Sequence, residues 1–218
     1  MSSREKILGR LRAAQKPFTD IPPVTQPRHM VPDVVDMGPA ELQARFMAEL
    51  ELLGCTIYRP SDNQDALDHI IAHIGDAKQV LSWDDAHLPV TGLSAALKEA
   101  SIDVMPFNDG EAYVGITGAD AALAATGSVI VSSGAGKFRT ASLLPDIHIA
   151  IVDANKLVAD FETWIANQRE QGLSAFRESS NTTIITGPSK TADIAQILIK
   201  GAHGPRKLHV VLVNAAVS

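Results

Sequence analysis

The chain has 218 residues, of which 45% are apolar, and a formal net charge of -6 at pH 7. A chain of this length can bury one substantial core, and its acidic charge argues against a nucleic-acid binder. Residues 17–118 carry 5 basic and 16 acidic side chains, whereas residues 119–218 carry 9 and 8. This relative excess of positive charge favours an anion site in the last part of the chain, although a solvated acidic face in the middle explains the same numbers.

Cys55 is the only cysteine. A disulfide framework, a Cys-rich zinc site and an iron-sulfur cluster held by this chain alone are therefore excluded. Cys55 opens a predicted strand, where we expect a buried structural thiol. The sequence has no run of 18 apolar residues and no signal-peptide pattern, so we expect a cytoplasmic protein without a membrane span.

The N-terminal segment differs from the rest of the chain. Residues 3–15 place Ile7, Leu8, Leu11 and Ala14 on one helical stripe, and six prolines follow between positions 17 and 39. Prolines at this density exclude a regular helix or a central strand. We therefore predict an arm over residues 1–39 that docks on its own domain, on a second copy or on a partner, and an α/β domain over residues 40–218.

From residue 40 onward, the hydrophobic periods of helix and strand alternate. We expect helices over 40–53, 64–74, 93–100, 119–124, 160–168 and 191–200. We expect strands over 55–58, 79–82, 102–106, 129–132, 148–152, 183–186 and 208–213. Strands rich in Val and Ile between amphipathic helices are typical of a sheet covered on both faces. The sequence predicts a three-layer α/β/α sandwich with a mostly parallel sheet.

Three Gly-rich turns with hydroxyl or basic side chains adjoin predicted strands in the last part of the chain. They lie in SVIVSSGAGKFRT, TTIITGPSKTADI and GAHGPRKLHVVLV. Ligands of open α/β sheets gather beyond the carboxyl ends of the strands, and glycine lets a backbone approach them closely. We therefore expect the three turns to form a single site for an anionic ligand.

The first turn resembles a dinucleotide-binding loop only in part. Arg139 stands where the third small residue should be, and Pro145 leaves too little chain for the helix of a parallel crossover. What remains is an anion cradle of backbone amides, hydroxyls and basic groups. A tight connection with solvated basic side chains is the alternative. The candidate ligand-binding residues are Ser133, Gly134, Gly136, Lys137 and Arg139.

The second and third turns supply the other candidates. Helix capping alone explains Ser189 or Thr191, the helix dipole alone explains Asp193, and the glycine spacing does not match a P-loop. A loop histidine such as His203 is free to titrate or to bind a ligand, whereas His209 falls within a strand pattern and should be packed. The candidate ligand-binding residues here are Thr186, Gly187, Ser189, Thr191, Asp193 and Gly204, with His203 as a candidate catalytic residue. No metal ligands and no cofactor are predicted for this chain alone.

Residues 113–213 resemble the LUD-domain family, in particular its lactate-utilisation protein C group. The resemblance rests on GITGADAALAATGSVIVSSGAGKFRTASLLPDIHIAIVDANKLV, on ITGPSKTADI and on HGP, in this order and spacing. It implies a fold like that of ribose-5-phosphate isomerase, the coenzyme A transferases and 5-formyltetrahydrofolate cyclo-ligase. It also implies a role beside two iron-sulfur proteins in oxidising lactate to pyruvate.

The chain departs from the family at Ala125, where the family usually has a glutamate. If that glutamate has an acid/base or metal-binding role, Ala125 cannot perform it. Asp120 is the better of the nearby acids as a catalytic candidate, because it should open a helix that faces the same region, although a capping role explains it equally well.

Two functions are consistent with these observations. The first is an accessory subunit of a lactate-oxidising system that binds an anionic metabolite or cofactor, docks to iron-sulfur partners and possesses no redox group of its own. The second is a stand-alone enzyme of cyclo-ligase or isomerase type. In that enzyme Arg139 and Lys190 hold a phosphate, and Asp120 or His203 transfers protons.

Overall fold

The structure is a computed structural model, which describes residues 2–14, 37–191 and 199–214. Residues 2–14 belong to one compact unit and residues from Val31 onward to another. The first unit contains helix α1 (Ser3–Ala14), where the Ser2 hydroxyl accepts from the Glu5 amide at 3.2 Å and the Glu5 carboxylate accepts from the Ser2 amide at 2.6 Å. This reciprocal contact closes the first turn of the predicted amphipathic helix. The proline-rich segment lies outside the described residues.

The second unit is built on a central six-stranded sheet. All five pairs of neighbouring strands in it are parallel. In spatial order the strands are β1 (Thr56–Tyr58), β12 (Lys207–Val213), β7 (Ile147–Asp153), β4 (Val114–Gly118), β2 (Gln79–Ser82) and β3 (Asp103–Val104). The predicted α/β class with a mostly parallel sheet is confirmed.

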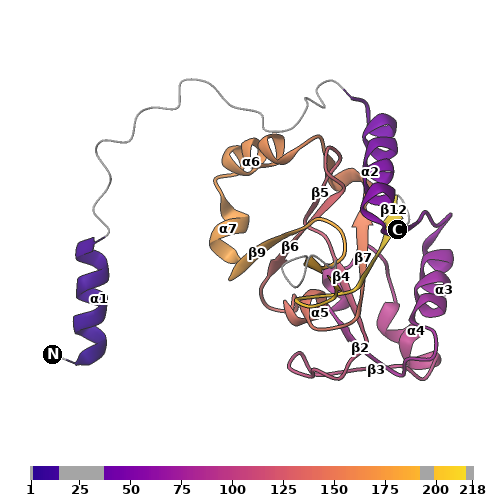
Figure 1. Ribbon diagram of the computed structural model, residues 1–218, viewed down its shortest axis with the longest axis horizontal. Coiled ribbons are helices and arrows are strands. Elements are labelled where there is room, and N and C mark those ends of the chain that lie inside the picture. The colour runs from indigo at the N-terminus through magenta and orange to yellow at the C-terminus, as the bar shows by residue number, and fades with distance from the viewer. Residues whose placement is uncertain (1, 15–36, 192–198, 215–218) are drawn as a thin grey trace. The chain divides into compact units, whose positions relative to one another are not determined.

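Helices surround this sheet and a second sheet described below, on which α6 packs (Figure 1). They are α2 (Pro39–Leu53), α3 (Asn63–Ile74), α4 (Leu93–Glu99), α5 (Thr140–Leu143), α6 (Phe161–Glu170) and α7 (Ser174–Glu178), with two short 3-10 turns, η1 (Asp85–His87) and η2 (Ala154–Lys156). Their ends follow from capping residues. The Asp62 carboxylate accepts from the Asp65 amide at 2.9 Å to start α3, and Gly54 ends α2 with a φ of 79°.

Strand β12 shows how the core is divided between the two faces of the sheet. Val211 and Val213 pack in one apolar cluster with residues of α3 and α4, whereas Val210 and Leu212 pack in a second cluster with residues of α2. Figure 1 shows α3 and α4 on the opposite side of β4 and β7 from α6 and α7. Successive residues of a strand point to opposite faces, so a strand that is covered on both faces has apolar residues in succession, as in Val210–Val213.

A second sheet, which the sequence did not predict, covers part of one face of the central sheet. It contains β8 (Leu157–Val158), β5 (Ala121–Leu123), β6 (Ser128–Ser133) and β9 (Asn181–Ile185) in this order. Strand β6 pairs antiparallel with both β5 and β9, and β5 pairs parallel with β8. The strands next to the three Gly-rich turns therefore belong to two different sheets.

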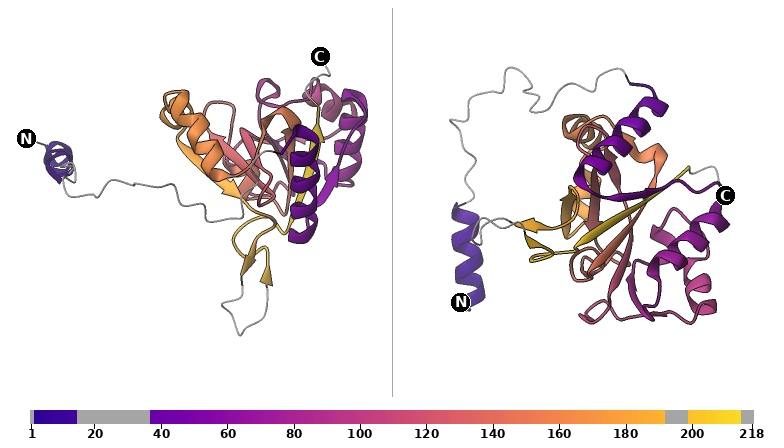
Figure 2. Two further views of the ribbon diagram at one scale, coloured as in Figure 1. Left: turned by 90° about the horizontal axis from the view of Figure 1, so that it is seen from above. Right: turned by 45° about the vertical axis from the view of Figure 1, so that its right-hand side comes forward.

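One predicted helix, over 119–124, is wrong. A second, over 191–200, is wrong at its described ends, and its residues 192–198 lie outside the described residues. Residues 121–123 of the expected 119–124 helix form β5, whose three side chains are all buried. At the ends of the expected 191–200 helix, β10 (Lys190–Thr191) pairs antiparallel with β11 (Ile199–Lys200). In Figure 2 this pair projects from the body. Sheet pairing overrides local helix propensity at both places.

Burial at two further positions agrees with the sequence predictions. Cys55 is buried, and burial raises the pKa of its thiol to about 11. His209 is packed within β12 as expected, with 2% of its surface exposed. Among the described residues, no helix is long and apolar enough to span a bilayer.

Candidate functional site

The carboxyl ends of β2, β4 and β7 surround an open cleft. Trp83 and η1 follow β2, Asp120 lies two residues beyond β4, and η2 follows β7. The cleft consists of two adjoining cavities of about 350 and 210 Å³ that share His87, Asp120 and Lys137. We call it the carboxyl-end cleft. Its polar and charged lining includes His87, Asp120, Ser132, Ser133, Lys137, Lys156 and Glu178. In open parallel sheets this is the edge at which ligands bind.

An ion pair between Asp120 and Lys137 forms the centre of the cleft. The Lys137 Nζ atom donates to Asp120 Oδ1 at 2.6 Å and to Ser132 Oγ at 3.2 Å. The Ser132 amide donates to the other carboxylate oxygen at 2.5 Å. The Lys137 ammonium also lies 5.2 Å from the centre of the Trp83 ring, within the range of a cation–π contact. Both charged side chains are therefore held in place while about a quarter of each remains exposed, 23% for Lys137 and 28% for Asp120.

The Gly134–Lys137 turn connects this ion pair to the segment that follows β2. The Gly134 and Lys137 backbones exchange hydrogen bonds of 3.1 and 3.2 Å, and the Asp84 amide donates to the Gly136 carbonyl at 2.9 Å. Gly136 has a φ of 71°, and a Cβ there would lie 2.6 Å from Asp84 Oδ2 and 2.8 Å from His87 Cδ2. Glycine is required at this position for both its conformation and its close contact.

Asp120 reaches the cleft by a different route from the one expected. It opens no helix, because it lies between β4 and β5, where the chain passes from the central sheet to the second sheet, and its amide donates to the Ile130 carbonyl at 2.8 Å. This connection places the carboxylate against β6 and the turn that follows it. Asp120 thus lines the same cavity as Ser133, Gly134 and Lys137.

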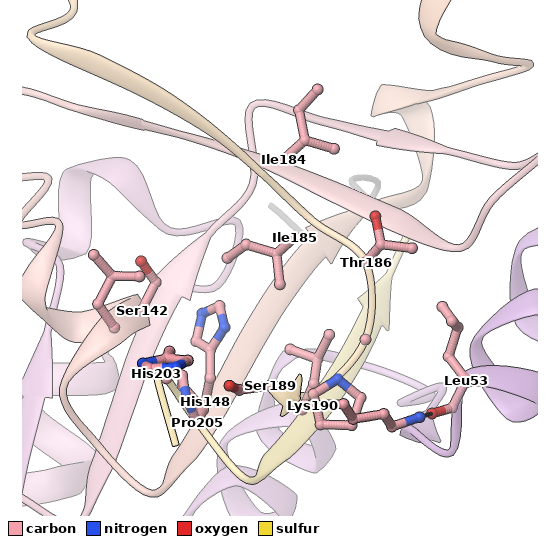
Figure 3. A pocket seen from close by; sticks show the side chains of 15 residues that line it. Leu53, Ser142, His148, Ile184, Ile185, Thr186, Ser189, Lys190, His203 and Pro205 are labelled. Carbon is pink, nitrogen blue, oxygen red and sulfur yellow. Dashed lines mark hydrogen bonds between the residues drawn. The ribbon is translucent and has the colours of Figure 1, made fainter. Parts of the chain in front are cut away.

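The second and third Gly-rich turns line a separate pocket, of about 410 Å³, which we call the His203 pocket. It includes the predicted residues Thr186, Gly187, Ser189, His203 and Gly204. The Ser189 amide donates to the Pro205 carbonyl at 2.9 Å, which holds the two turns together. Figure 3 shows Ile184 and Ile185 on one side of this pocket and His148 and His203 on the other.

Among the described residues, the carboxyl-end cleft and the His203 pocket share no lining residue, so the expected single site is divided. The physical reason is the direction of the strands. The third turn precedes β12 and so lies at the amino end of that strand, whereas the first turn lies beside the carboxyl ends of β2 and β4. In a parallel sheet these are opposite edges.

His148 lines the His203 pocket from β7 and is almost fully buried. Its Nε2 atom lies 2.8 Å from the Thr117 hydroxyl, and burial lowers its pKa to about 4. Lys190 is turned toward α2, where its Nζ atom donates to the Leu53 carbonyl at 2.8 Å. The cation expected to hold a phosphate is thus engaged by a backbone oxygen.

The remaining predicted residues lie elsewhere. Arg139 is exposed before α5, Thr191 pairs with Ile199 in the β10–β11 ladder, and neither lines the carboxyl-end cleft or the His203 pocket. Asp193 lies outside the described residues. Ala125 is buried, and its amide donates to the Ala159 carbonyl at 2.8 Å. Its methyl group can neither transfer a proton nor bind a metal.

Four polar or aromatic residues are the most notable of the cleft-lining residues that were not singled out from the sequence. They are Trp83, His87, Lys156 and Glu178. His87 follows the predicted strand over 79–82 in the run WDDAH, so its position after a strand end was an available signal. Glu178 ends α7, which no sequence pattern had indicated as a wall of the site.

Comparison with known proteins agrees with this architecture. The chain is 33% identical to lactate utilization protein C from Halalkalibacterium halodurans and 37% identical to that from Shouchella clausii, over 69% of both chains in each case. A crystal structure of a DUF162 family protein from Deinococcus radiodurans matches 82% of this chain and 99% of its own, with a TM-score of 0.59 and 21% identity. The LUD domain model matches residues 43–213. The chain therefore belongs to the LUD domain family.

Proposed function

We propose that this chain is an accessory subunit of a lactate-utilisation system, in which lactate is oxidised to pyruvate together with iron-sulfur proteins. The observation that carries the proposal is its identity of 33% and 37% to two proteins named lactate utilization protein C, over 69% of each chain. In this proposal the protein acts in the cytoplasm.

The sequence supports an accessory role rather than that of the electron carrier. A cluster needs several thiolate ligands, and this chain has only Cys55, which lies buried with its pKa raised to about 11. Electrons would therefore pass through the iron-sulfur partners, and this subunit would bind a ligand or position its partners.

We propose that the carboxyl-end cleft binds a small anionic metabolite. Lys137 and Lys156 supply positive charge, and the hydroxyls of Ser132 and Ser133 supply donors. The Lys156 ammonium donates to the carbonyl of Ala119, the residue before Asp120, at 3.2 Å, and both lysines line the same cavity as Asp120. A ligand with a carboxylate and a hydroxyl would satisfy both the cations and Asp120.

A second candidate function is that of an enzyme of cyclo-ligase or isomerase type. The observation that favours it is the placement of Asp120, Lys137 and His87 around one cleft at the carboxyl ends of the strands. Such a set can transfer protons to and from a bound substrate. In this case the purified chain alone should turn over a sugar phosphate or a folate.

The proposal is tested by deleting the gene in the source organism and measuring growth with lactate as the sole carbon source. Deletion should abolish that growth, and the wild-type gene and Arg139→Ala should both restore it, whereas Asp120→Asn and Lys137→Ala should not. Native purification should also recover iron-sulfur proteins with the wild-type chain. Normal growth of the deletion strain on lactate would contradict the proposed function. Turnover of a sugar phosphate or a folate by the purified chain would favour the second candidate.

A further inference from the structure

Three histidines lie together outside both pockets. His69 and His73 come from α3, and His209 comes from β12. Each offers one ring nitrogen, and these three atoms all lie within 4.8 Å of one another. The Nε2 atoms of His69 and His209 are 2.8 Å apart, and the rings of His73 and His209 stack with their centres 3.7 Å apart. We call this group the histidine cluster.

The fold creates the cluster by two regular spacings. His69 and His73 are four residues apart in α3 and so lie on one face of the helix. His209 alternates with Leu208 and Val210, so it points to the same face of β12 as Val211 and Val213, which pack against α3 residues. A helix face and a strand face thus bring three imidazoles to one point.

Neighbouring groups orient the rings. The Thr56 hydroxyl lies 2.6 Å from Nδ1 of His209, which leaves Nε2 as the ring atom that faces His69. Tyr58 stacks on His69 with ring centres 3.6 Å apart and donates to the Asp65 carboxylate at 2.6 Å. Metal-binding histidines are commonly held in this way, by a partner on the nitrogen that does not bind the metal.

The protonation state suits a metal ligand. Burial is the largest cause of a lowered pKa for His69, His73 and His209, and brings that of His209 to about 3. Burial thus favours the neutral imidazole, which is the form that binds a metal. Two nearby charges also affect these pKa values. The negative charge of Asp65 raises the pKa of His69, and the positive charge of Lys207 lowers that of His73.

We propose that His69, His73 and His209 bind a divalent transition-metal ion, with Zn²⁺ as the expected occupant and water as its fourth ligand. Imidazole nitrogens suit Zn²⁺ at about 2.0–2.1 Å, which places tetrahedral ligand atoms about 3.3 Å apart. The His69–His209 pair has to open by a few tenths of an ångström, and the His73 ring has to turn out of its stack. The partly exposed His69 and His73 leave the ion a path from solvent. A bound ion would tie α3 to β12.

The test uses the full chain without a polyhistidine tag. Titration with Co²⁺ should produce the visible absorption of a tetrahedral site, and calorimetry with Zn²⁺ should give one ion per chain. His73→Gln should weaken Zn²⁺ binding by more than about 100-fold, and Thr56→Val by about 10–100-fold, the usual loss for an outer partner of a ligand. His203→Gln, which changes a histidine of the separate His203 pocket, is the control and should bind Zn²⁺ as the wild type does.

Thermal melts distinguish loss of the site from loss of the fold. Zn²⁺ should raise the melting temperature of the wild type and of His203→Gln, but not that of a folded His73→Gln protein. Absence of stoichiometric Zn²⁺ binding to the wild type, or equal binding by a folded His73→Gln protein, would overturn the proposal.

Discussion

The Lys137 ammonium lies 2.6 Å from Oδ1 of Asp120, although the two residues belong to different connections of the fold. Asp120 lies after β4, where the chain leaves the central sheet, and Lys137 lies in the turn after β6. Their pairing exists only because β5 and β6 fold back on the central sheet. Because the ion pair lies at the centre of the carboxyl-end cleft, substitution of Lys137 tests this candidate site directly.

Replacing Lys137 with alanine should weaken anion binding. The variant removes the ammonium and leaves the Asp120 carboxylate to repel an anion, so the expected loss is about 1.5–3 kcal/mol, the range for a hydrogen bond to a charged group. Calorimetry with lactate, pyruvate and inorganic phosphate measures it. Arg139→Ala is the matched control, since this exposed cation does not line the cleft, and its dissociation constants should equal those of the wild type. Unchanged binding by Lys137→Ala would remove Lys137 from the site.

Gly136→Ala should damage the cleft, whereas Gly134→Ala in the same turn should not. A Cβ at Gly136 would lie 2.6 Å from Asp84 Oδ2 at a φ of 71°, whereas a Cβ at Gly134 would meet nothing within 4 Å. We expect Gly136→Ala to lower the free energy of unfolding by about 1–3 kcal/mol through clash and backbone strain. Urea denaturation of both variants provides the measurement. Equal stability of the two proteins would show that the turn adapts without cost.

The main elements were predictable because their buried positions are occupied by apolar residues at the spacing of a strand or a helix. The run Val210–Val213 of β12 is apolar on both faces of the sheet, and the helix Asn63–Ile74 combines an Asp62 cap with an apolar stripe. The segment Ala121–Leu123 was not predictable, because alanine favours helix locally and only pairing with Ser128–Ile130 makes it a strand. Tertiary pairing decided this element, and it also carries Asp120 into the cleft.

The candidate site was predictable only in its parts. The Gly-rich turns identified Lys137 and His203, but the order and direction of the strands separate these residues into two pockets. His69 and His73 carry a spacing that the sequence shows plainly, yet His209 joins them only through the packing of α3 on β12. The sequence alone identified the residue types of the site. The residues that they contact could be known only from the order of the strands in the sheets.

Acid should destabilise the protein in a way that depends on His148. Its pKa in the folded state is about 4, whereas it is near 6.5 in an unfolded chain. Between these values the unfolded state binds more protons, so the free energy of unfolding falls as the pH falls from 6.5 toward 4. The slope is at most about 1.4 kcal/mol per pH unit for each such histidine.

His148→Gln should therefore show a shallower decline between pH 6.5 and 4. It should also be less stable at pH 7, because it disturbs the packing and the Thr117 contact of a buried side chain. Some slope should remain, because burial also lowers the pKa of His209, to about 3. Val131→Ala is the control, since it removes buried apolar volume and keeps both histidines. Denaturant unfolding at several pH values measures the slopes. If His148→Gln declined as steeply as Val131→Ala, His148 would not be the titrating group.

Removal of residues 1–36 should leave the α/β body folded. The LUD domain match begins at residue 43, and the compact unit that contains the central sheet begins at Val31. Helix α2 keeps its own start in the truncated chain, because the Gly38 amide donates to the Glu41 carboxylate at 2.9 Å.

In α1, Ile7 and Leu11 are 59% and 55% exposed, so we propose that this apolar stripe docks on a second copy or on a partner. The truncated protein should melt cooperatively near the temperature of the full chain, while sizing should show the loss of self-association, or native purification the loss of a partner. Two substitutions in the full chain, Ile7→Ser with Leu11→Ser, should reproduce the loss of assembly without removing the arm. A truncated protein that cannot fold would place the domain boundary nearer the N-terminus than residue 37.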